Sequence, residues 1–284
     1  MAPLADLRPA GRRGLTVTHS PQTIRALLDE HGLEPRRALG QNFVVDPNTV
    51  RRIAALAEVG PGDPIVEIGP GLGSLTLALL ERDASVTAIE MDTELVPILR
   101  EVVAGRDVSI VEGDAQQVDW DVVLASHPAW KLVANLPYNV ATPLILDLLR
   151  DVPAITEMLV MVQFEVAERL AATAPDPAIG IPSVLVAYHG RAEVVGRVPP
   201  TVFHPKPRVD SALVRIVRHE HPPVDTSLDR LEPLVRAAYN QRRKMIRKSL
   251  SGLRTVEQIE AAGVDPQARP ETLDLAAWGR LAEA

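Results

Sequence analysis

The stretch Asn135-Leu136-Pro137-Tyr138 follows an apolar run and combines residue types suited to chemistry on an exocyclic amine. An adenine amino group is a poor nucleophile, because its lone pair is delocalised into the ring. The side-chain oxygen of Asn135 and the carbonyl of Leu136 or Pro137 could accept its two N–H groups and favour a more tetrahedral nitrogen. Tyr138 offers a ring on which an extruded base could stack. The stretch therefore predicts methylation of adenine, and an ordinary strand-to-helix turn is the alternative.

A second aromatic residue, Phe203, opens a loop stiffened by Pro205 and Pro207. We predict that Phe203 forms the second face of a base sandwich opposite Tyr138. The alternative is a rigid loop whose phenylalanine packs in the core.

A glycine-rich turn containing Gly69, Gly71 and Gly73 links an apolar run to a segment that reads as a helix. A strand, a tight turn and a helix in this order present a nucleotide-like ligand at the edge of an open parallel sheet. Glycine lets the backbone approach that ligand without an intervening Cβ. The G-x-G-x-G spacing differs from the dinucleotide pattern G-x-G-x-x-G, which weakens a pyrophosphate interpretation. Glu67, just before the turn, indicates instead a cofactor that carries positive charge; a purely structural turn remains the alternative.

Acidic residues also end the next two predicted strands. Glu90 lies about 20 residues after Gly69, where a doubly wound sheet places the carboxylate that binds ribose hydroxyls. Asp114 ends the third strand and could meet an adenine amino group, and Asn135 ends the fourth. Polar residues at the same edge of four strands predict an adenosine-type site, which we interpret as a site for S-adenosylmethionine.

The segment from Arg236 to Arg254 is strongly basic and contains no acidic residue. We predict that it lies on one helix, from Leu228 to Leu253, whose cations form a stripe at i,i+4 spacing. Such a stripe is either a solvated face or, in an otherwise acidic chain, a surface that binds RNA phosphates. The residues predicted to bind RNA are Arg242, Arg243, Lys244, Arg247 and Lys248.

Composition bounds the class of protein. The 284 residues include no cysteine, which excludes disulfides, thiolate metal sites and a cysteine nucleophile. The net charge of −7 argues mildly against a nucleic-acid partner, although clustered cations outweigh net charge. No apolar run approaches the ~20 residues of a membrane span, and no signal peptide is evident, so we expect a cytoplasmic protein without membrane contact. His219 and His221 have no third ligand in sight, so we expect no metal.

The elements that would position these residues form two regions. We predict an α/β domain over residues 19–219 and a helical RNA-binding domain over 220–284, joined by a linker near 219–225. Residues 1–18 read as a disordered tail. Within the α/β domain, the apolar segments Ile181 to His189 and Ala192 to Val198 read as strands.

Five motifs in this order resemble the ribosomal RNA adenine dimethyltransferase family: Gly40 to Phe43, Glu67 to Gly73, Asn135 to Asn139, Phe203 to Ser211 and Asn240 to Lys244. The resemblance implies a seven-stranded Rossmann-like, class I S-adenosylmethionine-dependent methyltransferase domain with a small all-α C-terminal domain. By position it implies cofactor contacts from Asn42, Val44, Gly69, Glu90, Asp114 and Asn135.

Within the family, the motifs are most similar to the bacterial branch that dimethylates two adjacent adenines near the 3′ end of 16S rRNA. This implies a monomer whose partner is 16S rRNA in the immature 30S subunit. Two alternatives stay open. The first is the related resistance methyltransferase of 23S rRNA, which the Phe203 loop and the run from Asn240 to Lys244 disfavour. The second is an assembly factor that only binds the subunit, against which Asn135 and Glu90 argue.

Overall fold

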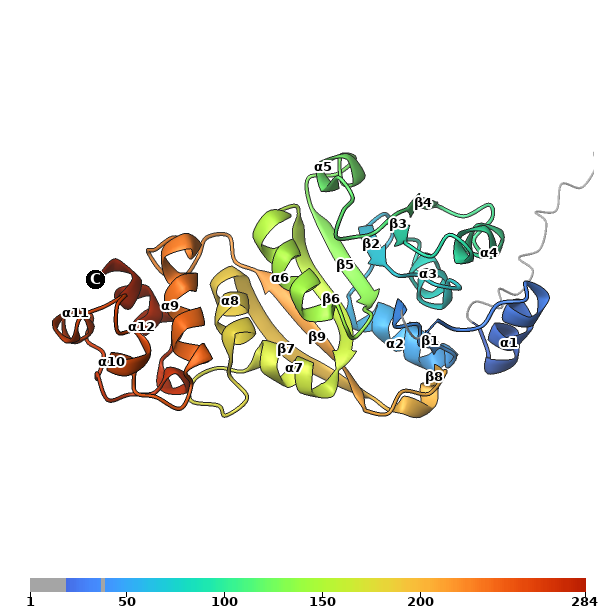
Figure 1. Cartoon of the computed structure of the whole chain (residues 1–284). Helices are drawn as coiled ribbons and strands as arrows, with labels where there is room; N and C mark the ends of the chain where they lie inside the picture. Colours follow the sequence, from blue (N-terminus) through green and yellow to red (C-terminus); the bar gives the residue numbers. More distant parts are fainter. Residues whose placement is uncertain (1–18, 37–38) are drawn as a thin grey trace, which may run out of the picture.

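The computed structural model describes residues 19–36 and 39–284, so the predicted tail at 1–18 lies outside the described residues (Figure 1). Its centre is a seven-stranded sheet in the order β4-β3-β2-β5-β6-β9-β7. Neighbouring strands from β4 to β6 pair in parallel, whereas β9 is antiparallel to both of its neighbours. The strands are β2 (Pro64–Ile68), β3 (Ser85–Glu90), β4 (Val108–Glu112), β5 (Trp130–Asn135), β6 (Ile155–Gln163), β7 (Gly190–Val198) and β9 (Ser211–Arg218).

The central strands are apolar on both sides because helices cover both faces of the sheet. Along β5, Leu132 and Ala134 belong to one hydrophobic cluster and Val133 to the other. The cluster on the first face includes residues of α6 (Ala141–Asp151) and α7 (Phe164–Ala171), with α5 (Trp120–Val123) nearby. The cluster on the second face includes residues of α2 (Pro47–Leu56), α3 (Ser74–Leu80) and α4 (Leu95–Val102). This arrangement confirms the predicted α/β class.

The strand order reverses between β2 and β5, since β3 and β4 extend one way and β6 the other. Ligands of open α/β sheets bind in the crevice outside the carboxyl ends of the strands at such a switch point. A short N-terminal segment crosses near this crevice. It contains α1 (Pro21–Glu30) and β1 (Phe43–Val44), and β1 pairs antiparallel with β8 (Phe203–His204).

The prediction of a strand at Ile181 to His189 is wrong, because this segment is the helix α8 (Ile181–His189). Its Val186 packs in the core of the sheet domain, whereas Val184 and Tyr188 pack in the C-terminal core. A helix buried on both sides has no polar face, so the sequence lacks the helical period that would have identified it. The second predicted strand, Ala192 to Val198, lies within β7.

The helices of the C-terminal region gather beyond α8, at the end of the molecule away from β4 (Figure 1). They enclose Trp278, whose side chain is fully buried. Tyr188 of α8 donates a hydrogen bond of 2.9 Å to the Thr226 carbonyl in the connecting segment. The helices are α9 (Leu228–Asn240), α10 (Ile246–Ser249), α11 (Val256–Ala261) and α12 (Leu275–Glu283).

The prediction of one continuous helix from Leu228 to Leu253 is also wrong, because the chain turns between α9 and α10. At about 100° per residue, a continuous helix would place Ile246 about 80° away from Ala238. Both of these side chains, and Leu250, are fully buried in the same core. The turn between the two helices lets Ile246 and Leu250 face the same core as Ala238. The main-chain N–H of Ile246 donates to the Ala268 carbonyl at 2.8 Å. The basic residues therefore do not form a single helical stripe.

None of the helices in residues 19–36 and 39–284 is long and apolar enough to cross a membrane.

Candidate active site

The glycine-rich turn connects β2 to α3 at the switch point of the sheet. Gly69, Gly71 and Gly73 have φ values of 69°, 57° and 85°, in the left-handed region that favours glycine. A Cβ on Gly71 would lie 2.9 Å from a ring carbon of Phe43, too close for any other residue. The turn therefore needs glycine both for its own conformation and for the approach of β1.

The Glu90 carboxylate holds this turn against the end of β3. Its Oε2 accepts a hydrogen bond of 2.9 Å from the main-chain N–H of Gly71, and its Oε1 accepts one of 2.8 Å from that of Asp92. Burial raises the pKa of Glu90 above its ordinary value. Each carboxylate oxygen keeps a second lone pair, so Glu90 can still accept from a ligand in the crevice.

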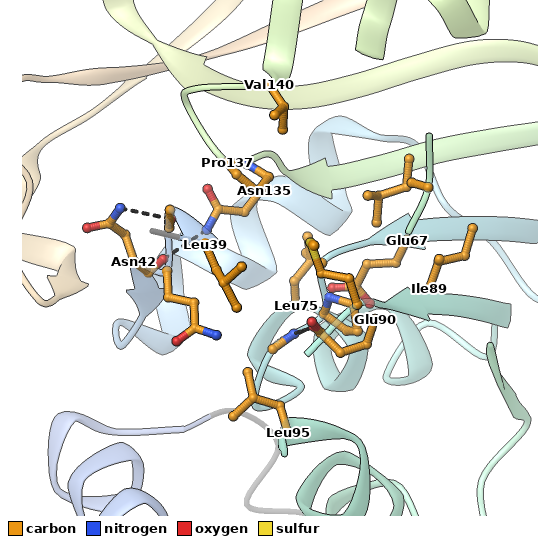
Figure 2. A pocket seen from close by; sticks show the side chains of 18 of the residues that line it. Leu39, Asn42, Glu67, Leu75, Ile89, Glu90, Leu95, Asn135, Pro137 and Val140 are labelled. Carbon is orange, nitrogen blue, oxygen red and sulfur yellow. Dashed lines mark hydrogen bonds between the residues drawn. The ribbon is translucent and has the colours of Figure 1, made fainter. Parts of the chain in front are cut away.

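The Asn135 side chain lies at the end of β5 beside the segment that precedes β1 (Figure 2). Its Nδ2 donates a hydrogen bond of 3.0 Å to the main-chain carbonyl of Asn42. The Asn42 side chain in turn donates to the Gly40 carbonyl at 3.1 Å. Because its nitrogen is engaged, the Asn135 amide keeps its oxygen as a free acceptor, and no described residue donates to it.

One cavity brings together the predicted residues that end the strands and form the turn. All the residues predicted to bind a cofactor line it, together with Pro137 from the predicted catalytic set. Leu136 is 1% exposed and does not line the cavity. That the residues of the predicted cofactor set contact a cofactor stays a prediction. The cofactor set is Asn42, Val44, Gly69, Gly71, Glu90, Asp114 and Asn135.

The structure does not form the predicted base sandwich. Phe203 is 4% exposed and packs in the core, because β8 pairs with β1 and places Phe203 opposite Val44. The Tyr138 hydroxyl lies 2.6 Å from the Ser211 hydroxyl, and neither Tyr138 nor Phe203 lines the cavity. Phe203 thus adopts the alternative position, packed in the core, and presents no free face for a base in this conformation.

Sequence reasoning missed several residues of the cavity. Gln41 lines it, and its Nε2 donates to the Asp92 carboxylate at 2.6 Å. Asp92 is 4% exposed and also accepts from Arg36 at 3.1 Å, which ties the N-terminal segment to the loop after β3. Met91 lines the cavity while 49% exposed. The position of Met91 directly after Glu90, the acid that ends a predicted strand, is the sequence signal that could have identified it as a cavity residue.

Glu67 lines the cavity, and its side chain is 1% exposed. Burial raises its pKa to about 8, and the nearby carboxylate of Glu90 acts in the same direction. A cation beside this carboxyl group would favour its charged form. That Glu67 meets a positively charged cofactor stays a prediction.

The cations predicted to bind RNA divide into two groups. Arg242 donates to the Pro177 carbonyl at 2.8 Å and lies 3.8 Å from Glu271, so it bridges α9 to the loop before α8. The other four are exposed and form no ion pair within the described residues: Arg243, Lys244, Arg247 and Lys248.

Among residues 19–36 and 39–284, no group of three or more His, Cys, Asp or Glu side chains is placed to hold a metal ion.

A seven-stranded sheet of this order, a glycine-rich turn after β2 and acids after β3 and β4 define a Rossmann-like methyltransferase of class I. A model of the ribosomal RNA adenine dimethylase family matches residues 32–284. The chain belongs to this family, and the family predicted from the sequence is confirmed.

Relatives with similar sequences carry one name. "Ribosomal RNA small subunit methyltransferase A" of Cutibacterium acnes is 46% identical over 281 residues, which cover 93% of each chain. The protein of the same name from Moorella thermoacetica is 45% identical over 271 residues, 90% of this chain and 94% of the relative.

Two solved structures share the fold. The 23S rRNA methyltransferase ErmE is 30% identical with a TM-score of 0.68, over 85% of this chain and 98% of its own. A dimethyladenosine transferase from Plasmodium falciparum is 24% identical with a TM-score of 0.67, over 83% of this chain and 94% of its own. The second likeness concerns the fold alone.

Proposed function

We propose that this rRNA adenine dimethyltransferase transfers methyl groups from S-adenosylmethionine to N6 of two adjacent adenines near the 3′ end of 16S rRNA. Relatives named for the small subunit support the choice of 16S rRNA, since two of them are 45–46% identical over at least 90% of this chain. ErmE, named for 23S rRNA, is less similar at 30%. The immature 30S subunit is the proposed form of the substrate.

The donors and acceptors around the cavity fit this cofactor. Glu90 is placed to accept from ribose hydroxyls, and Asp114, at the end of the neighbouring strand, to accept from the adenine amino group. Glu67 provides a buried carboxyl for the positively charged part of the cofactor. The close approach of Phe43 to Gly71 puts Asn42 and Val44 along the cavity.

S-adenosylmethionine, when bound, supplies an electrophilic methyl group. Asn135 orients the nucleophile, because its free Oδ1 accepts one N–H of the target amine at the end of β5. Of the two predicted carbonyl acceptors, Leu136 and Pro137, Pro137 lines the cavity, and its carbonyl accepts the other N–H. Accepting both bonds makes the amine more tetrahedral and lets its lone pair turn toward the methyl group. No strong general base is needed, because the alkylated nitrogen loses its proton readily.

Tyr138 stands next to these acceptors and provides a stacking surface for the extruded base. Phe203 can join it only if β8 and its loop move on RNA binding, because its ring is packed in the core. Arg243, Lys244, Arg247 and Lys248 supply the phosphate contacts that hold the RNA.

The single observation that carries the proposal is the Asn135 amide, whose nitrogen is bonded to Asn42 and whose oxygen stays free beside the cavity. The test is to methylate 30S and 50S subunits from a strain that lacks this protein and to identify the products by mass spectrometry. We expect dimethyladenosine at two adjacent positions near the 3′ end of 16S rRNA. Methylation confined to 23S rRNA would instead assign the chain to the activity for which ErmE is named.

A further inference from the structure

Three buried polar atoms at the end of β2 and in the first turn of α3 lack a hydrogen-bond partner within the described residues. They are Oε2 of Glu67, Oγ of Ser74 and Oγ1 of Thr76. The side chains are 1%, 8% and 0% exposed, and Glu67 and Ser74 line the cavity. Unpaired buried polar atoms are costly and uncommon, so such a group indicates a ligand that completes it.

Within residues 19–36 and 39–284, no cation is paired with the Glu67 carboxyl group. From β3, on one side, the charged neighbour is the carboxylate of Glu90. From α3 come the Ser74 and Thr76 hydroxyls; Thr76 opposes the rise in the pKa of Glu67 but does not reach hydrogen-bonding geometry with it. On the other side, the Lys131 ammonium of β5 lies opposite Ile65, near the far end of β2, and binds the Glu58 carbonyl and Asp63.

We propose that Glu67 is a proton-linked receptor for the cationic part of the cofactor: neutral in the empty cavity, it ionises when the cofactor binds and releases its proton. This inference rests on the proposed function, because it takes S-adenosylmethionine as the cofactor. The proton leaves to solvent, and the carboxylate that remains faces either the sulfonium or the ammonium group of the cofactor. No other bond changes in this step.

Two consequences follow. Below the pKa of about 8 that burial gives Glu67, cofactor binding must first remove a proton. Affinity should therefore rise about tenfold for each pH unit and level off above that value. In addition, methyl transfer converts the sulfonium to a neutral thioether. If Glu67 faces the sulfonium, the product S-adenosylhomocysteine leaves Glu67 free to take a proton back, which weakens product binding relative to cofactor binding.

The test is isothermal titration calorimetry of S-adenosylmethionine into the full-length chain at pH 7, in phosphate and in Tris. The dependence of the observed enthalpy on buffer ionisation enthalpy gives the number of protons released. We expect about one for the wild type and none from this site for Glu67→Gln, which keeps the shape of the neutral side chain. Subtracting the number of protons released by the variant from the wild-type number removes any contribution from ionisation of the cofactor itself. Asp114→Asn, a change to a cavity acid that is not among the groups shifting the pKa of Glu67, is the matched control and should retain the release while binding more weakly.

Proton release on binding the product or an analogue shows whether Glu67 faces the sulfonium or the ammonium group of the cofactor. If Glu67 faces the sulfonium, S-adenosylhomocysteine should release few protons, whereas sinefungin, with an amine in place of the sulfonium, should behave like the cofactor. Equal release by all three would assign the ammonium group.

Cofactor binding without proton release, or unchanged release by Glu67→Gln, would overturn the inference and leave the proposed function standing. Failure of the wild type to bind S-adenosylmethionine would overturn both. If Glu67→Gln does not fold, the wild-type affinity between pH 6 and pH 8 decides, since a flat profile contradicts the linkage.

Discussion

Asn135 and Asn42 are joined by a hydrogen bond of 3.0 Å from the Asn135 side-chain nitrogen to the Asn42 main-chain carbonyl, across 93 positions of sequence. The bond connects the end of β5 to the N-terminal segment beside the cavity (Figure 2). It also sets the orientation of the amide, because a bonded nitrogen leaves the oxygen as the free end. In the proposed mechanism, the same contact shapes the cofactor site and orients the acceptor for the target amine.

Replacing Glu90 by alanine should weaken S-adenosylmethionine binding by about 2 kcal/mol or more, the scale of a lost hydrogen bond to a charged group. Part of that loss would come from the turn, since Glu90 also accepts from the main chain of Gly71. Titration calorimetry measures the effect, with circular dichroism to check folding. Wild-type affinity in a folded Glu90→Ala protein would remove Glu90 from the cofactor site.

Reversing the charges of Arg243 and Arg247 to Glu should lower affinity for RNA and flatten its salt dependence, because phosphate contacts release counterions. Binding of free cofactor should stay unchanged, since both residues belong to the C-terminal region. RNA affinity measured over a salt series tests this. Arg191→Glu, on the exposed edge of β7, is the control for a charge reversal elsewhere. If the double variant keeps the wild-type salt slope, these cations only face solvent.

Arg242 should behave differently from its neighbour Arg243. Because it donates to the Pro177 carbonyl, Arg242→Ala should lower the free energy of unfolding by about 1 kcal/mol or less, given its partial exposure. It should change the salt slope of RNA binding less than Arg243→Ala does. Denaturant unfolding and the same salt series measure the two quantities. An Arg242→Ala variant with unchanged stability and a reduced salt slope would place Arg242 with the phosphate contacts instead.

The free energy of unfolding of the cofactor-free protein should depend on pH in a way that reflects the raised pKa of Glu67. Its pKa rises from an ordinary 4.5 to about 8 on folding, so between these values the folded state binds more protons than the unfolded state. The contribution of Glu67 is therefore unfavourable to folding as pH rises from about 4.5 to about 8, at about 1.4 kcal/mol per pKa unit, and levels off above that.

Thermal unfolding of the wild type and Glu67→Gln over this pH range isolates the contribution of Glu67. The difference between them should grow with pH in favour of the variant. A difference that does not change with pH would mean that Glu67 ionises as easily in the folded state as in the unfolded state.

The parallel strands and the cavity residues at their carboxyl ends could be predicted because their signals are local. An apolar run identifies the strand that leads to Gly69. The acids Glu90 and Asp114 likewise come at or just after the end of an apolar run. Elements that pack against two hydrophobic cores could not be predicted in this way. Helix α8 is apolar all round because it packs against both cores.

The basic segment shows the same limit. Its residues have good helix propensity, and the turn between α9 and α10 accompanies the burial of Ile246 and Leu250 in the C-terminal core. Phe203 is a similar case, because nothing in the loop sequence reveals the pairing of β8 with β1 that packs its ring in the core.

The central claim is that the Asn135 oxygen activates the target amine. Asn135→Ala removes an acceptor whose bond strengthens as the nitrogen gains positive charge, so the loss should fall on the chemical step. We expect a decrease of roughly 10²–10³-fold in the rate of methyl transfer, the usual scale for one preorganised group. RNA affinity should persist, since phosphate contacts supply most of it. Cofactor affinity must be measured separately, because the variant also loses the bond to Asn42.

Single-turnover methylation of the small subunit at saturating RNA and cofactor is the decisive measurement, with Asn48→Ala, on the exposed side of α2, as the matched control. The account predicts a rate for Asn135→Ala at least about 10²-fold below that of the control. Dimethylation of adenine by Asn135→Ala at the wild-type rate under these conditions would contradict it.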